Sequence, residues 1–177
     1  MKKIVSAMLL SAVISAPAFA GSWTDAPVGT KYAVVDIGSI SYSSLGSATS
    51  ISIGGGYQVS PYVAVEADYL MGGKYSYSVF GVGADYQLTS LQVMAVGNYS
   101  INDQFGAYAK AGLAMNSQKA TASVFGFSSS VTTSSNDLTF AIGGKYKVNK
   151  DIALRLQYQE TGISSVNVFS VGAMFNF

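Results

Sequence analysis

The sequence predicts an all-β chain that folds as an eight-stranded, antiparallel, up-and-down transmembrane β-barrel. Along most of the chain, apolar residues alternate with small or polar ones, which is the period of a strand with two different faces. Only 11% of the 177 residues are charged, whereas Gly, Tyr and Phe number 19, 12 and 9. The last stretch alternates three Phe residues with small or polar ones and ends on Phe177, as expected of a strand that faces lipid.

The first twenty residues predict a cleaved signal peptide. Lys2 and Lys3 precede a mostly apolar stretch, and Ala18 and Ala20 are small residues where a signal peptidase reads the chain. We expect residues 1–20 to be removed and residues 21–177 to form one barrel domain; a retained membrane anchor is the alternative. The mature chain would keep eight of the ten basic residues against nine acidic ones. This near balance predicts no strong attraction to nucleic acid.

The first four strands are expected at residues 31–42, 51–59, 62–71 and 91–101. In the first, Val35 and Ile37 alternate with Asp36 and Gly38. The other three place Ile, Val, Leu, Ala or Tyr on one face and, mostly, Ser, Gly or charged and amide residues on the other. A polar loop is expected at residues 43–50, and Ser60-Pro61 predicts a tight turn.

The last four strands are expected at residues 105–116, 138–146, 152–159 and 166–177. Asn102-Asp103 and Asn149-Lys150 predict turns, and residues 117–136 predict a long Ser/Thr-rich loop. Residues 72–90 also alternate and could form a ninth strand. With eight strands, however, the three short turns fall at one end and the long connections at the other, as in outer-membrane barrels. Residues 72–90 are therefore interpreted as an outer loop whose arms extend a hairpin beyond the membrane.

One face of the strands collects six charged residues together with Gln58, Gln92, Gln157 and Gln159. The six are Asp36, Glu66, Asp68, Lys110, Lys145 and Arg155. A soluble barrel or sandwich would bury the apolar face instead, but the signal peptide, the scarce charge and the aromatic end favour lipid there. Because an unpaired ion inside protein is costly, three acids and three bases predict a network across the interior. We expect Glu66 and Asp68 to face Arg155, with Lys110 or Lys145 nearby. The network either forms a small ion path or gate, or it only pairs the buried polar groups and makes the interior rigid.

Four groups of residues resemble the small outer-membrane barrels of the OmpA/OmpX type, the outer membrane protein β-barrel domain family, over roughly residues 32–177. They are Gly55-Gly56-Tyr57-Gln58 before Ser60-Pro61-Tyr62, Val63-Ala64-Val65-Glu66-Ala67-Asp68-Tyr69, Tyr108-Ala109-Lys110-Ala111-Gly112, and Leu154-Arg155-Leu156-Gln157-Tyr158-Gln159. The resemblance implies an interior acid–arginine pair at Glu66 and Arg155. The chain departs from the family at Lys145, where the family's network carries an acid.

The resemblance also implies a bacterial outer-membrane location, with membrane lipid and lipopolysaccharide as surroundings. The closing Phe175-Asn176-Phe177 is similar to the signal that the barrel-assembly machinery reads on a final strand. We therefore expect Phe169, Phe175 and Phe177 to serve assembly and closure. A monomer is expected.

The chain contains no His and no Cys, which bears on its class of function. Enzymes built on outer-membrane barrels rely on an active-site His, so we expect a non-enzymatic protein without cofactor, metal or nucleic-acid partner. A structural or surface-contact role is the first hypothesis, and a narrow ion-conducting channel is the alternative. Phe125 and Phe127 lie amid Ser and Thr in the longest loop. They either form an apolar tip that contacts another surface or pack on the barrel rim.

Overall fold

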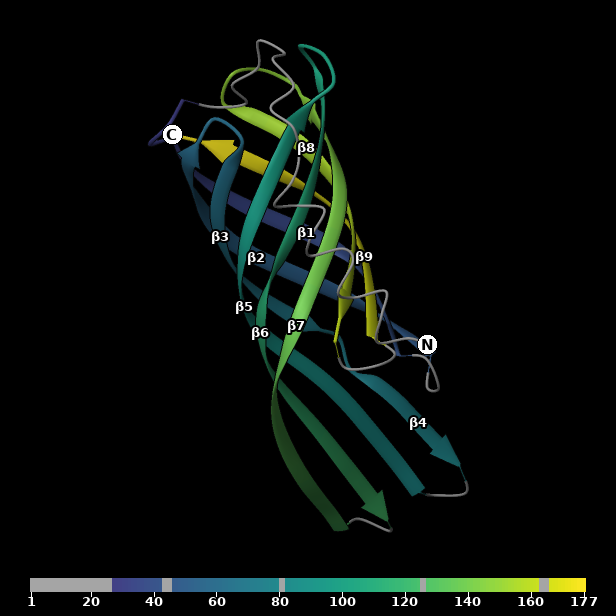
Figure 1. Cartoon of the computed structure of the whole chain (residues 1–177). Helices are drawn as coiled ribbons and strands as arrows, with labels where there is room; N and C mark the ends of the chain where they lie inside the picture. The colour runs from purple at the N-terminus through teal and green to yellow at the C-terminus, as the bar shows by residue number, and fades with distance from the viewer. Residues whose placement is uncertain (1–26, 43–45, 80–81, 125–126, 163–165) are drawn as a thin grey trace, which may run out of the picture.

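Residues 27–42, 46–79, 82–124, 127–162 and 166–177 are described by the computed structural model, and their strands form one closed antiparallel sheet (Figure 1). The strands are β1 (Lys31–Tyr42), β2 (Gly46–Ser60), β3 (Val63–Gly72), β4 (Tyr75–Val79), β5 (Val82–Ser100), β6 (Phe105–Val124), β7 (Phe127–Lys147), β8 (Ile152–Thr161) and β9 (Val166–Asn176). Pairing of β1 with β9 and of β3 with β5 closes the sheet. The predicted signal peptide lies outside the described residues.

Nine strands make an eight-stranded barrel because β3 and β4 share one position. β3 pairs with residues 89–97 of β5, and β4 pairs with residues 82–86 of the same strand. Residues 75–79 and 82–86 therefore form the arms of an extended hairpin, and the fold class predicted from the sequence is confirmed. Within the described residues, no helix is both long enough and apolar enough to cross a membrane.

The predicted strands are present, but several were predicted too short. β2 begins at Gly46, so the end of the expected polar loop belongs to a strand. The prediction of a long loop in the Ser/Thr-rich residues 117–136 is wrong. β6 and β7 pair continuously there, from Phe105 and Tyr146 to Val124 and Phe127. The β-branched Thr and Val residues in this stretch favour a strand, but they do not give the apolar alternation of a strand that faces lipid.

All three short turns lie at the end of the barrel where β1 begins and β9 ends. In two of them an Asn side chain closes the turn: Asn102 Oδ1 accepts from the backbone N–H of Phe105 at 2.8 Å, and Asn149 Oδ1 accepts from that of Ile152 at 2.8 Å. Such local side-chain bonds replace the ladder bonds that the chain loses when it reverses. The turn positions predicted from the sequence are confirmed.

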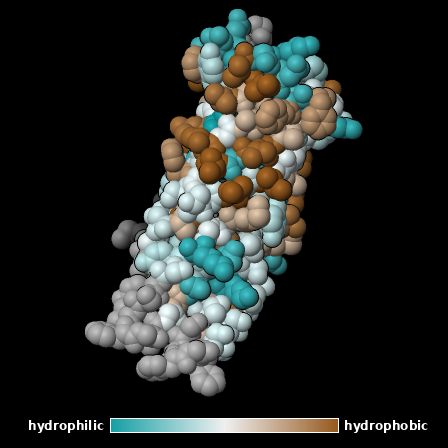
Figure 2. Space-filling model, turned by 180° about the vertical axis from the view of Figure 1, so that it is seen from behind, coloured by the Kyte–Doolittle hydropathy of each residue, from teal (hydrophilic) through white to brown (hydrophobic). Residues whose placement is uncertain are grey.

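The apolar face of the strands points outward. Val35, Val65, Leu113, Leu156 and Val171 are among many large apolar side chains that are exposed on the barrel wall. Figure 2 shows apolar side chains gathered in a zone between a hydrophilic end and a longer, weakly polar part. The zone is the surface expected to face hydrocarbon, so the polar face predicted from the sequence lines the interior.

Outer-membrane barrels have their short turns at the periplasmic end and their longer connections at the extracellular end. Toward the extracellular end of this barrel, the outer face becomes polar and the inner face becomes more apolar. Outward positions change from apolar to polar, for example from Ile37 to Ser39 and from Leu91 to Thr89. Inward positions become apolar and form a buried cluster of six residues: Ile40, Tyr42, Leu70, Leu88, Val166 and Val168. This outer plug fills part of the interior at the extracellular end with packed apolar side chains, beside buried polar residues such as Ser50 and Thr161.

Inward-facing glycines make room for the large side chains of the interior. A Cβ at Gly56 would overlap the Tyr32 ring, and one at Gly172 would overlap Asp36. Gly143 and Gly144 are neighbours with opposite surroundings. A Cβ at Gly143 would overlap the Tyr108 ring and the Leu156 carbonyl oxygen, whereas the nearest atom at Gly144 is 3.8 Å away. Glycine is needed at one of the two positions and is replaceable at the other.

We predict that Gly143→Ala destabilises the barrel by about 1–3 kcal/mol, because a backbone carbonyl and a packed ring must both shift. Gly144→Ala, the matched control, should leave stability within about 0.5 kcal/mol. The measurement is urea unfolding in lipid vesicles, followed by the mobility difference between boiled and unboiled samples on gels. Equal midpoints for the two variants would contradict the predicted crowding at Gly143.

Candidate functional site

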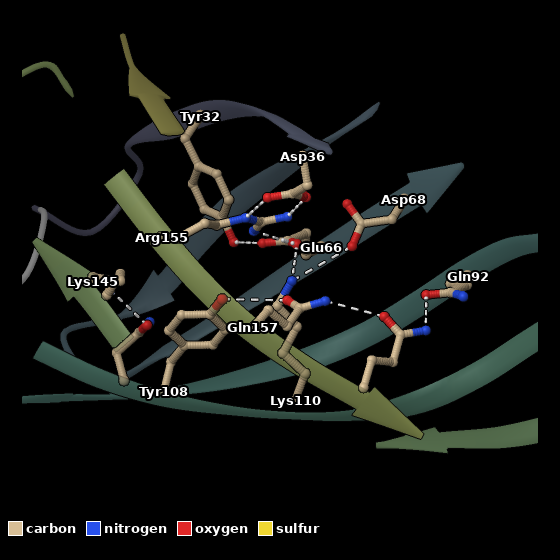
Figure 3. A network of polar contacts seen from close by, with 12 residues as sticks. Tyr32, Asp36, Glu66, Asp68, Gln92, Tyr108, Lys110, Lys145, Arg155 and Gln157 are labelled. Atoms are coloured by element: carbon tan, nitrogen blue, oxygen red, sulfur yellow. Dashed lines mark hydrogen bonds and ion pairs between the residues drawn. The ribbon is translucent and has the colours of Figure 1, made fainter. Parts of the chain in front are cut away.

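Five charged side chains meet in the barrel interior, each at most 5% exposed: Asp36, Glu66, Asp68, Lys110 and Arg155. They come from four strands, β1, β3, β6 and β8, and project inward from opposite sides of the barrel (Figure 3). Period-2 alternation puts them all on the inner face. Three carboxylates therefore share two cations in a space closed to solvent.

Arg155 ties β8 to β1 and β3. Its Nε donates to Asp36 Oδ1 at 2.6 Å, and its Nη2 donates to Asp36 Oδ2, so the pair is bidentate. Its Nη1 donates to Glu66 Oε1 at 3.0 Å. The planar guanidinium matches the spacing of a carboxylate's two oxygens, and this fixes orientation as well as charge.

Glu66 is the centre of the network. Its Oε1 accepts from both Arg155 and Lys110, and its Oε2 accepts from the Tyr32 hydroxyl at 2.9 Å. Lys110 Nζ also lies 3.5 Å from Asp68 Oδ2. One carboxylate thus connects β1, β3, β6 and β8, and its loss would leave two buried cations with fewer partners.

A ladder of amides continues the network toward the extracellular end. The Tyr108 hydroxyl donates to Gln157 at 3.3 Å, Gln157 donates to Gln159 at 3.1 Å, and Gln159 donates to Gln92 at 3.0 Å (Figure 3). Each amide both donates and accepts, so a chain of them satisfies buried polar atoms without adding charge. The outer plug lies on the extracellular side of this ladder.

The pairing expected from the sequence is partly wrong. Glu66 does contact Arg155, but the second acid on Arg155 is Asp36, and the cation beside Asp68 is Lys110. Register explains this: Asp36 lies opposite Gly172, which in turn lies opposite Arg155, so no side chain separates the pair. Lys145 donates to Asn98 Oδ1 at 2.9 Å, nearer the periplasmic end.

The periplasmic end of the interior holds a small cavity of about 30 Å³. Its lining includes Tyr32, Asn98, Tyr108 and Lys145. The volume suits about two water molecules, because one needs about 10–15 Å³ of such space. Within the described residues, no group of three or more His, Cys, Asp or Glu side chains is arranged to hold a metal ion.

The second notable region is the part of the sheet that extends beyond the outer plug, away from the short turns. It consists of β4, the first part of β5, the last part of β6 and the first part of β7, which project from the barrel at the bottom of Figure 1. We call this four-stranded part the extension. Burial raises the pKa of the Tyr86 phenol there, and the hydroxyl donates to Gln118 Oε1 at 2.6 Å.

The remaining residues singled out from the sequence lie apart from the network. Phe169, Phe175 and Phe177 are exposed on the outer wall of the closing strand, and Phe177 exchanges backbone hydrogen bonds with Lys31 at 2.9 and 3.2 Å. Phe125 lies outside the described residues. Phe127 is the first residue of β7, at the tip of the extension.

Sequence reasoning missed two kinds of residue in the interior. Tyr32 and Tyr108 contribute hydroxyls to the network, and their position on the same face as Asp36 and Lys110 could have shown this. The outer plug was missed because inward apolar residues such as Val168 break the apolar-out pattern. The signal was present, since Val168 is an exception to the alternation of the last strand.

The outer membrane protein β-barrel domain family matches residues 6–177. Outer membrane protein A of Salmonella typhi is 31% identical over 137 residues, covering 70% of this chain and 38% of that protein. The protein of the same name from Escherichia coli O157:H7 is 32% identical over 107 residues, covering 60% and 30%. The chain thus spans about a third of the length of the curated relatives it matches.

Solved structures show the same fold at lower identity. Neisserial surface protein A has a TM-score of 0.65 and 23% identity, covering 84% of this chain and 99% of that one. The attachment invasion locus protein Ail of Yersinia pestis, in complex with the heparin analogue sucrose octasulfate, has a TM-score of 0.64 and 17% identity, covering 85% and 99%. With the family match over nearly the whole chain, this chain belongs to the outer membrane protein β-barrel domain family and lies in the bacterial outer membrane.

Proposed function

We propose that the protein is a non-enzymatic barrel that displays the extension for contact with other surfaces. The observation that carries this proposal is the unbroken pairing of β6 with β7, which continues from the lipid-facing wall to Val124 and Phe127 without a register shift. A sheet that needed only to span hydrocarbon would end after about 9–11 residues per strand, whereas β6 has 20 and β7 has 21.

The surface of the extension supports a role in water. Its described side chains are mostly Ser, Thr, Ala and Gln, and Lys119 and Val131 are exposed. Ladder bonds to the barrel make such a sheet a stiff support, which presents a contact surface with little loss of conformational entropy. Ail is an attachment protein by name, but at 17% identity it supports the fold alone, so the contact role rests on the extension.

Several features support a non-enzymatic role. The chain has no His to act as a base or to assist a nucleophile. The buried carboxylates contact cations and a phenol, and five side chains hold one another in place. We therefore assign the network the structural role, a brace across the barrel that fixes its cross-section.

We further propose that residues 1–20 direct export and are removed. The closing strand, with Phe169, Phe175 and Phe177, is proposed to be what the barrel-assembly machinery reads. Closure leaves no unpaired strand edge within lipid, which supports a monomer in the plane of the membrane. Lipopolysaccharide is the proposed neighbour of the wall at the extracellular side.

If the network is a brace, Lys110→Met should lower the free energy of unfolding by about 3–5 kcal/mol, because Asp68 loses its buried cation and Glu66 loses one of its two. Lys119→Met is the matched control: the same substitution on the same strand, at an exposed position, with an effect within about 0.5 kcal/mol. Urea unfolding in vesicles measures both. Equal stability of the two variants would argue against the brace.

If the extension makes the contact, replacing residues 119–132 with an Asn-Gly turn should abolish adhesion and leave the barrel folded. Gln118 and Thr133 are paired, so a two-residue turn can join them. Adhesion is measured as the number of expressing bacteria retained on cultured epithelial cells and on a layer of one another. Phe125→Ser with Phe127→Ser then asks whether the tip alone is responsible. Undiminished adhesion by the shortened barrel would refute the contact role.

The narrow channel stays the second candidate, favoured by the buried charges and the periplasmic cavity. The outer plug works against it, because a constriction lined by apolar side chains opposes the passage of ions. We predict no discrete current steps from the purified protein in planar bilayers. Lys110→Met should also be silent, since it leaves the plug intact. Regular unitary steps from the unmodified protein would overturn this and favour conduction.

A further inference from the structure

The extension has a free edge along β7. Pairing between β7 and β8 ends at Thr139 and Thr161, with one further bond from the Gly162 N–H to the Leu138 carbonyl at 2.7 Å. Beyond this point, among the described residues, β7 pairs with β6 and with no other strand. Residues 128–134 of this edge are all exposed. The left border of the projecting strands in Figure 1 is this edge.

The direction of the backbone groups on this edge follows from the ladder. Leu138 directs its carbonyl toward β8, and Lys147 directs its N–H toward Gln104 on the β6 side. Groups alternate along a strand, so the even-numbered residues of β7 point away from β6. The N–H and C=O groups of Ser128, Ser130, Thr132 and Ser134 therefore face the free edge.

This edge lacks the features by which proteins prevent strand addition. Natural edges carry Lys, Pro or a bulge, or they are very short. Residues 128–136 contain no charged residue and no Pro, and their pairing with β6 shows no register shift. An added strand would meet neither a charge nor a missing donor.

The sequence of the edge is symmetric in chemical type. Val131 is flanked by three hydroxyl residues on each side, Ser128-Ser129-Ser130 and Thr132-Thr133-Ser134. In an antiparallel pair of two such segments centred on Val131, hydroxyl residues meet hydroxyl residues and Val131 meets Val131. The pairs Ser130–Thr132 and Ser128–Ser134 then exchange backbone hydrogen bonds. Cross-strand pairs of Ser and Thr are favourable, and identical uncharged segments do not repel each other.

We propose that this edge pairs with the same edge of a second copy of the chain held in a facing membrane, so that the protein joins two membranes to each other. This rests on the proposed contact function and names its partner. Two barrels in one membrane have β7 strands that both run toward the periplasm, so their edges could meet only in parallel. In the antiparallel pair, a two-fold axis perpendicular to the strands relates the two copies. Such an axis reverses the direction of one barrel, so the two membranes face each other. A short edge makes a weak bond, and many copies per membrane multiply it.

A single-cysteine experiment tests the register, because the chain has no Cys of its own. In the proposed pair, two Val131 residues are a non-hydrogen-bonded pair with Cα atoms about 4.5 Å apart, within disulfide reach. Two Thr133 residues are four positions apart, about 13 Å. Val131→Cys in phospholipid vesicles should form disulfide dimers on mild oxidation at least fivefold more than Thr133→Cys, the matched control on the same face.

Mixing two vesicle populations shows where the partner is. Ser129→Cys vesicles and Thr133→Cys vesicles should cross-link when mixed, and each population alone should not. Cross-linking of Val131→Cys that persists when the protein is diluted to one copy per vesicle also supports facing membranes, provided that it depends on vesicle concentration. Equal cross-linking at residues 131 and 133, or no dimer between vesicles, would overturn the proposal.

Introducing charges at the edge gives an independent measure that needs no cysteine. Ser130→Lys with Thr132→Lys should abolish vesicle clustering, measured as turbidity, and so should Ser130→Glu with Thr132→Glu. A mixture of Lys-bearing and Glu-bearing vesicles should cluster again, because opposite charges then face each other. If no variant changes clustering, while shortening the extension still abolishes adhesion to epithelial cells, the self-pairing is wrong and the contact function stands.

Discussion

The lack of hydrogen-bond partners in hydrocarbon is the constraint on which the structure depends. Every backbone N–H and C=O in the lipid zone must find another strand, so the sheet closes where β1 meets β9. Eight strands enclose a space that side chains must fill. Filling it with ions is tolerable only if they are paired, and Glu66 between Lys110 and Arg155 is the centre of that solution. The inward glycines follow, because such large side chains need positions without a Cβ opposite them.

The change of faces along each strand records where the hydrocarbon ends. In the lipid zone apolar side chains point out and the interior carries charges and amides, whereas at the extracellular end Ser39 and Thr89 point out and Ile40 and Leu88 point in. The same sheet therefore obeys the rule of a membrane barrel over one part and the rule of a soluble protein over the next. The outer plug is the consequence, and it separates the polar interior from the outside.

Much of the fold could be predicted from period-2 alternation. Strand positions and the shared face of Asp36, Glu66 and Arg155 follow from it, because the strand period fixes which side chains share a face. The three turns follow from their turn residues, and the inward direction of the polar face follows from the scarce charge and the aromatic end of the chain. The detailed pairing could not be predicted, since it depends on registers such as Arg155 opposite Gly172 opposite Asp36. The half of the extension formed by β6 and β7 was mistaken for a loop, because its Ser and Thr residues carry no apolar alternation. Apolar alternation is the signal of a lipid-facing wall and not of strand pairing itself.

Closure and the free edge are two results of one geometry. A barrel has no edge only while all its strands continue, and here β8 ends at Thr161 while β7 extends toward Phe127. The unequal lengths that raise the extension above the membrane thus also expose backbone groups along residues 128–136. Inside hydrocarbon such groups would be costly, but in water they are solvated and available to another strand. An edge of this kind can be kept only where the membrane ends, which is where a contact between surfaces would use it.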